Sequence, residues 1–220
     1  MTTFETPAPI AAVLDIPAGR VQFIAADRAD TTVEVRPADA SKSRDVKVAE
    51  ETTVEYADGV LRIAAAARNQ LLGSSGFIEV TVQLPAGSRV EAKAASAELR
   101  GVGRLGDVVF EGALGEIKLD EAASVRSTTS AGDVAIGRLT GPAEITTVKG
   151  DVQISEAVRG AVALRTQAGS ITVLAAPGVS ASLDAGTGYG RISNDLRNDG
   201  AAVLDITATT GYGDIVARSL

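Results

Sequence analysis

The feature that most constrains this chain is a repeat of 17 to 23 residues in its C-terminal half. Each copy has a glycine, an aliphatic residue two positions after it and, in five of six copies, a threonine three positions before it. The copies begin at Gly115, Gly132, Gly150, Gly169, Gly190 and Gly213. Of the 23 glycines, 18 lie after residue 100, so the regular architecture is expected there.

Within one copy, apolar residues alternate with polar residues, which indicates two short β-strands. The inward parity switches at the glycine: Ala143, Ile145 and Thr147 share one parity, whereas Val152 and Ile154 share the other. A sharp corner between two strands that both face inward requires this switch, and glycine permits the backbone geometry of the corner.

A unit this small cannot bury its own apolar face, so neighbouring units must stack. The sequence therefore predicts an all-β fold, a parallel β-helix-like solenoid with about six to seven regular C-terminal coils. We expect right-handed connections between its parallel strands. The rival interpretation, a left-handed helix, usually shows three steps per coil, and two strands with a looser connector are found here. We expect successive coils to be neighbours, so that Ile215–Leu220 ends the stack at an open edge.

The N-terminal half is β-rich but irregular, and we expect residues 1–89 to begin and cap the solenoid of residues 90–220 in one continuous domain. A separate small β-domain is the alternative. Polar excursions are expected at Pro37–Asp45 and Arg68–Gly76, and the one plausible short helix at Ile63–Leu72. Alternating strands are predicted at Val21–Ile24, Thr32–Arg36, Thr52–Tyr56, Val60–Ile63 and Phe77–Leu84.

At two places in the N-terminal half a similar pattern occurs, Val82–Val90 and its echo Leu14–Val21. Together with the T-x-x-G-D-(I/V)-x-(I/V) copies, this pattern resembles the bacterial putative-adhesin, β-strand-repeat family, a domain of unknown function. The resemblance covers most of the chain and rests on repeats, with no catalytic signature. It implies a parallel β-helix-like fold and leaves the function open.

The composition excludes several functions. The chain has no His, Cys or Trp, so a histidine-based triad, a His or Cys metal site, a catalytic thiol and a disulfide framework are ruled out. Its net charge of −7 and its lack of a basic run argue against nucleic-acid binding. We expect no cofactor and no metal.

The first basic residue is Arg20, and Pro7 and Pro9 interrupt the start, which is not the pattern of a signal peptide. No run of 18 apolar residues occurs, so no membrane span is expected. We therefore expect a cytoplasmic protein.

The residues that follow the corner glycines form a partly acidic column that includes Asp133 and Asp151. A calcium site or a glycoside-cleaving carboxylate pair is the functional interpretation. A turn residue whose carboxylate binds nearby backbone amides is the structural one, and we favour it.

The repeated threonines are expected to line the corner and to bond one another or nearby backbone groups. They are Thr129, Thr147, Thr166, Thr187 and Thr210. Tyr189 and Tyr212 occupy equivalent points of two copies and should stack. A structural pair is the favoured interpretation of the tyrosines, and a sugar-binding platform is the alternative.

Together these features predict a non-enzymatic scaffold or interaction protein that associates with itself or with an unidentified protein partner. Two alternatives stay open: a carbohydrate-binding or carbohydrate-cleaving β-helix protein, and a cytosolic regulatory module that binds a partner.

Overall fold

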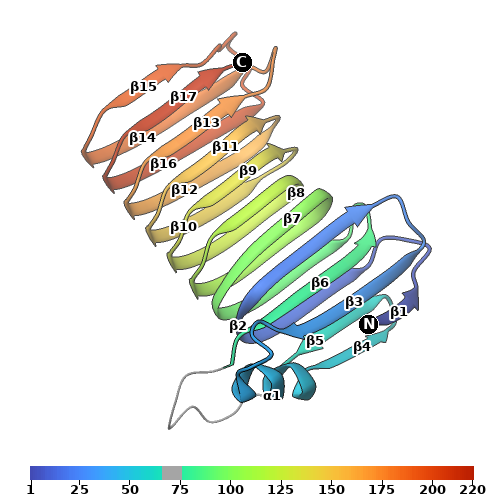
Figure 1. The fold of residues 1–220 in the computed structure, drawn as a ribbon. Coiled ribbons are helices and arrows are strands. Elements are labelled where there is room, and N and C mark those ends of the chain that lie inside the picture. Colours follow the sequence, from blue (N-terminus) through green and yellow to red (C-terminus); the bar gives the residue numbers. More distant parts are fainter. Residues whose placement is uncertain (66–75) are drawn as a thin grey trace. The chain divides into compact units, whose positions relative to one another are not determined.

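The computed structural model describes residues 1–65 and 76–220 as an all-β chain with one short helix (Figure 1). This confirms that the fold is all-β. The chain forms two compact units, Met1–Gly115 and Glu116–Leu220, which are described separately below.

Unit 1 contains seven strands and the helix. They are β1 (Thr2–Glu5), β2 (Ala11–Ala26), β3 (Asp30–Pro37), α1 (Ser43–Glu51), β4 (Thr53–Ala57), β5 (Val60–Ala64), β6 (Ile78–Pro85) and β7 (Arg89–Leu114). These strands include every stretch predicted as alternating in the N-terminal half, apart from single residues at the ends of two stretches.

The long strand β2 takes part in both layers of unit 1. Its first part, Ala11–Asp15, lies between β5 and the start of β7, and its second part, Gly19–Ala26, lies between β6 and a later part of β7. All of these pairs are parallel, whereas β3, β4 and β1 add antiparallel strands outside them. Phe4 on β1 and Tyr56 on β4 meet with ring centroids 5.4 Å apart, so an aromatic contact joins the two outer strands.

Helix α1 was not predicted. The helix starts inside the segment Pro37–Asp45, which was expected to be a polar excursion. Asp45 is its one buried residue. The Asp45 carboxylate accepts a hydrogen bond from the backbone amide of Phe77 (2.9 Å), which ties the helix to the segment before β6. The apolar residues of α1, which are Val46, Val48 and Ala49, are few and only half-buried, so the sequence signal for the helix is weak. The helix expected at 63–72 is wrong at its start, where Ile63 and Ala64 belong to β5; residues 66–75, and with them most of the second excursion, lie outside the described residues.

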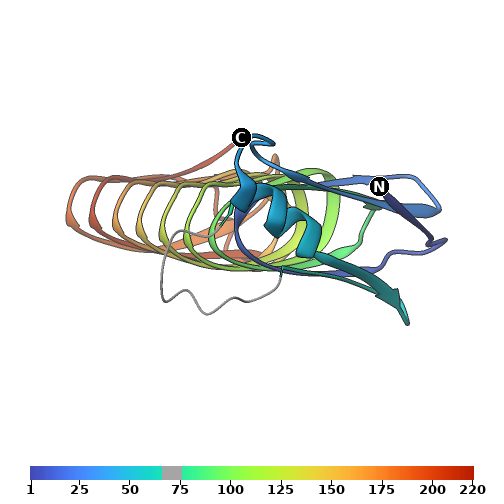
Figure 2. The ribbon, with the colours of Figure 1, turned by 60° about the horizontal axis from the view of Figure 1, so that its bottom comes forward.

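Unit 2 is built from coils, each with one strand in each of two layers (Figure 2). Its strands are β8 (Ile117–Ala131), β9 (Val134–Leu139), β10 (Ala143–Lys149), β11 (Val152–Ala157), β12 (Gly160–Ala168), β13 (Ile171–Ala175), β14 (Ala181–Tyr189), β15 (Ile192–Asp195), β16 (Leu204–Tyr212) and β17 (Ile215–Ser219). Strand β8 bends and contributes to both layers. The predicted parity switch is confirmed, because Ala143, Ile145 and Thr147 are buried before the corner and Val152 and Ile154 after it.

The strands of unit 2 pair in parallel, but not always with the next coil in sequence. One layer has the order β8–β10–β12–β16–β14, and the other has the order β8–β9–β11–β13–β17–β15. The last coil of the chain, β16–β17, is therefore inserted between β12–β13 and β14–β15. The expectation that Ile215–Leu220 forms an open edge is wrong, since β17 pairs with β13 on one side and β15 on the other.

The lengths of the connectors explain how the chain skips one coil position and later returns to fill it. Only residues 158–159 join β11 to β12, whereas residues 176–180 join β13 to β14 and residues 196–203 join β15 to β16. The longer connectors give the chain the reach to pass one coil position outward and then return. Ser180 anchors both connectors: its hydroxyl accepts a hydrogen bond from the Asp199 amide (3.1 Å), and its carbonyl accepts one from the Val203 amide (3.0 Å).

Candidate functional site: the corner and the open coil of unit 2

The glycines of the T-x-x-G corners come too close to the neighbouring coil to carry a side chain. A Cβ on Gly150 would lie 2.2 Å from the carbonyl oxygen of Gly132, and a Cβ on Gly169 would lie 2.0 Å from that of Gly150. Both residues also have positive φ angles, 149° and 154°. The same conformation occurs at Gly132, Gly190 and Gly213. Glycine therefore sets the close stacking of the corners.

The threonine column lies just inside the corner and is a structural feature. The Thr166 hydroxyl donates to the carbonyl of Gly150 (3.1 Å), the Thr210 hydroxyl to that of Gly169 (2.9 Å), and the Thr187 hydroxyl to that of Gly213 (3.0 Å). Thr147 reaches the carbonyl of Lys149 (3.3 Å), and the buried hydroxyl of Thr129 has no partner in the part of the chain that the structure describes. The hydroxyls thus bind backbone carbonyls of the corners.

The acidic column outside the corner binds backbone amides of the neighbouring coil. The Asp133 carboxylate accepts a hydrogen bond from the Asp151 amide (2.8 Å), and the Asp151 carboxylate accepts one from the Ser170 amide (2.7 Å). At the far end, Asp214 accepts from the Arg191 amide (2.8 Å) and pairs with the Arg191 guanidinium (3.3 Å). These interactions hold the pKa of Asp214 below its ordinary value, and the hydrogen bond from the Arg191 amide contributes most.

The acidic column therefore joins coil to coil, whereas the structural interpretation expected hydrogen bonds within the turn. No group of three or more metal-ligating His, Cys, Asp or Glu side chains occurs among the described residues.

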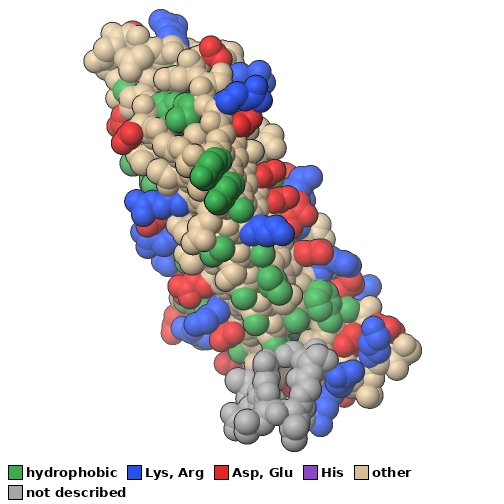
Figure 3. Space-filling view, turned by 90° about the vertical axis from the view of Figure 1, so that its left-hand side faces the viewer, with side chains coloured by type: hydrophobic (Ala, Val, Ile, Leu, Met, Phe, Trp, Pro, Cys, Tyr) green, Lys and Arg blue, Asp and Glu red, His purple; other side chains and the backbone are tan. Residues whose placement is uncertain are grey.

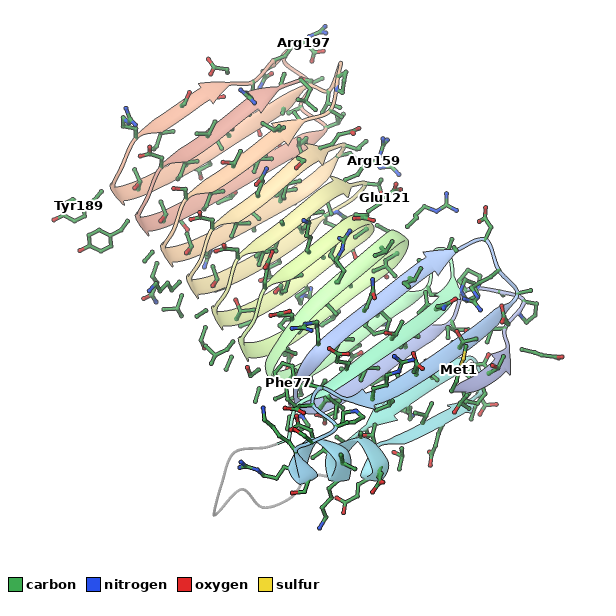
Figure 4. All side chains as sticks on the ribbon, viewed as in Figure 1. Met1, Phe77, Glu121, Arg159, Tyr189 and Arg197 are labelled. Carbon is green, nitrogen blue, oxygen red and sulfur yellow. The ribbon has the colours of Figure 1, made fainter. Side chains whose placement is uncertain are left out.

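Tyr189 and Tyr212 lie in register on β14 and β16 and stack outside the corner. Their ring centroids are 5.0 Å apart and their planes differ by 5°. The two residues are 71% and 63% exposed, and Figure 4 shows Tyr189 projecting away from the strands. Figure 3 looks onto this side of the molecule, where exposed hydrophobic side chains lie between acidic and basic ones. The stacking prediction is confirmed, and both ring edges remain open to solvent.

The outermost coil, β14–β15, exposes positions that are buried in every neighbouring coil. Ile192 is 46% exposed, whereas Ile215 and Ile171, its partners in the same column, are 1% and 0% exposed. Leu183 is half-buried, whereas Ile206 beside it is buried. Both β14 and β15 pair on one side only among the described residues. Sequence reasoning missed this open coil, although the longer spacings that end at Gly190 and Gly213 were a signal for it.

These features define an all-β repeat protein with parallel-paired coils and a glycine-lined corner. The chain belongs to the Toastrack DUF4097 family, whose profile matches residues 13–219. In the part of the chain that the structure describes, no helix has the length and apolarity that crossing a bilayer requires.

Solved structures support the same fold. A putative adhesin from Bacteroides fragilis superposes with a TM-score of 0.58 at 13% identity, covering 98% of this chain and 95% of that one. A putative cell adhesion protein from Clostridium sporogenes also matches, with a TM-score of 0.36 at 13% identity over 100% of this chain and 98% of that one. A comparison with curated protein sequences gives no match.

Proposed function

We propose that this protein is a non-enzymatic β-solenoid scaffold that associates with a second copy of itself through the open coil β14–β15. The observation that carries the proposal is the exposure of Ile192, at a column position where the neighbouring coils bury their aliphatic residue completely. An exposed strand edge with apolar residues beside it favours pairing with another strand.

A second copy suits this end because its charges are of both signs. Asp184 and Asp195 lie on the strands of the open coil, and Arg191 and Arg197 lie on its corner and its connector. A two-fold axis brings the same patch of each copy together, so a patch with both signs can meet itself without net repulsion. Asn194 takes the place that Ala217 occupies in the next coil, which keeps the edge partly polar and favours a reversible contact.

The acidic column supports a structural role over catalysis. Asp133 and Asp151 each hold a backbone amide of the next coil, so both carboxylates already serve the stacking of the corners. A glycoside-cleaving pair needs one carboxyl group that is free to donate a proton and a second that is free to attack or to activate water.

The test is the mass of the protein in solution. Light scattering after size exclusion should show a mass that rises toward a dimer as the concentration reaches the high micromolar range. Ile192→Lys should hold the protein as a monomer because it places a charge in the contact. The matched control is Val148→Lys, since Val148 is 44% exposed but lies on the corner side of β10. A strictly monomeric wild type, or an Ile192→Lys variant that still dimerises, would overturn the proposal.

A further inference from the structure

The tyrosine stack ends beside Ala168, which carries only a methyl group. Each position of this column, one per strand, is called a rung below, and the rung of Ala168 is the open rung. In the column just before the corner glycines, Tyr189 is in register with Tyr212, Tyr212 with Ala168, and Ala168 with Lys149. One face of the Tyr212 ring is covered by Tyr189. Its other face looks along the column toward Ala168, where only a methyl group extends from the backbone. Tyr212 therefore keeps an open aromatic face even though it is stacked.

The space between Tyr212 and Lys149, at the level of Ala168, is wide enough for one ring. Neighbouring parallel strands are about 4.8 Å apart, so the rungs of Tyr212 and Lys149 are separated by about 10 Å. A ring placed on Tyr212 at van der Waals distance, about 3.5 to 4 Å, occupies the level of Ala168 and leaves Lys149 on its far side. Ala168 is exposed, as are Lys149 and Gln167, so the rung is accessible from solvent.

The groups around the rung are hydrogen-bonding groups. Lys149 provides an ammonium group, Gln167 precedes Ala168 and provides an amide, and the Ser170 hydroxyl lies just past the corner. A pyranose ring has an apolar C–H face that packs on an aromatic ring and a rim of hydroxyls that meets such donors and acceptors. A purely aromatic ring would stack equally well but would form no hydrogen bonds with Lys149 and Gln167.

We propose that Tyr212, Ala168 and Lys149 form a binding site for one pyranose ring of a glycan. Tyr212 supplies the stacking face, Ala168 the space, and Lys149 with Gln167 the hydrogen bonds to the ring hydroxyls. Tyr189 is a positioning residue that supports the back of the Tyr212 ring. The site lies on the corner and shares only Tyr189 with the open coil. It does not include Ile192 or Leu183, so it adds a ligand to the proposed scaffold and does not depend on self-association.

The chain is suited to a direct optical test, because it has no Trp and three Tyr. In a Tyr56→Phe background, all tyrosine fluorescence comes from the stacked pair. Titration with cellohexaose and with mannohexaose should give a saturable change in that fluorescence for at least one of them. The C–H protons of the bound sugar should shift upfield in NMR spectra, because they lie over the ring of Tyr212.

Ala168→Tyr is the decisive variant. It extends the stack into the open rung, leaves Tyr212 in place, and should weaken sugar binding at least tenfold. Its matched control is Ala131→Tyr, since Ala131 lies in the same column on the other side of Lys149 and a ring there leaves the rung of Ala168 open. Tyr212→Ala should abolish both the fluorescence change and the upfield shifts, whereas Tyr212→Phe should retain the shifts.

Three outcomes would overturn the proposal. The first is no saturable response to either hexasaccharide up to about 10 mM, which covers weak single-ring affinities. The second is an Ala168→Tyr variant that binds sugar as the wild type does. The third is a response to N-acetyltyrosinamide without one to the sugars, which would make this a site for aromatic side chains. Repeating the titration with Ile192→Lys separates the two proposals, because sugar binding should persist in that variant whether or not the wild type dimerises.

Discussion

Thr166 lies in register with Thr210 and not with Thr187, the next threonine of the repeat in sequence. Thr187 in turn lies in register with Thr210 from the other side. The last coil of the chain is thereby an interior coil of unit 2, and the coil before it in sequence is the outermost one. This order decides which strand edge is open and which tyrosine lies beside the open rung.

The exchange of coil order predicts an unusual pattern of amide protection. Amides of β16 and β17 should exchange with deuterium more slowly than those of β14 and β15, although β17 lies nearest the C-terminus. The reason is that β16 and β17 are paired on both sides, whereas β14 and β15 are paired on one. Hydrogen exchange followed by mass spectrometry measures this. If residues 215–219 exchange before residues 192–195, the coil order described here is wrong.

The corner glycines predict a large loss of stability on substitution. Gly150→Ala should lower the free energy of unfolding by at least about 2 kcal/mol, because the new Cβ meets the carbonyl of Gly132 in a backbone conformation that L-residues rarely adopt. Urea denaturation measures the change. Gly186→Ala on β14 is the control, since nothing lies within 4 Å of the Cβ built there, and it should change stability little. Equal losses in the two variants would contradict the account of the corner.

The threonine column offers a matched pair of substitutions. Thr210→Val removes the hydroxyl that donates to Gly169 at 2.9 Å and should cost about 1 to 2 kcal/mol, because a carbonyl loses its partner. Thr129→Val removes a buried hydroxyl that has no partner among the described residues, so it should be neutral or stabilising. Thermal or urea unfolding of both variants tests this. A Thr129→Val variant that loses more stability than Thr210→Val would contradict it.

The carboxylates with lowered pKa values predict acid sensitivity. Backbone and side-chain hydrogen bonds from Arg191 lower the pKa of Asp214, and a hydrogen bond with Ser180 is the main cause of the lowered pKa of Asp199. A carboxyl whose pKa is lower in the folded state contributes stability above its unfolded pKa and loses it as the pH falls through the folded pKa. The free energy of unfolding should therefore decrease below about pH 4.

Asp214→Asn should flatten this decrease, because the amide side chain does not titrate. Urea denaturation from about pH 7 down to about pH 3 provides the measurement. An Asp214→Asn variant with the acid dependence of the wild type would show that Asp214 does not contribute to it.

The sequence alone determined the all-β fold, the strands of each coil and the inward parity, because these depend on local alternation and on the glycine at each corner. It also predicted the stacking of Tyr189 with Tyr212, since residues at equivalent places in neighbouring copies share a column. Helix α1 escaped prediction because it is short, buries only Asp45 fully and has few apolar residues.

Only the tertiary structure decided the order of the coils. Every copy presents nearly the same apolar residues to its neighbours, so Ile171 can pack on Ile215 as well as on Ile192, and local pattern does not distinguish the two arrangements. The choice depends on long-range pairing and on the anchoring of the connectors at Ser180, which are not properties of any one repeat. The same choice placed Tyr212 beside Ala168, and so created the open rung that the sequence, read in order, would have put beside Tyr189.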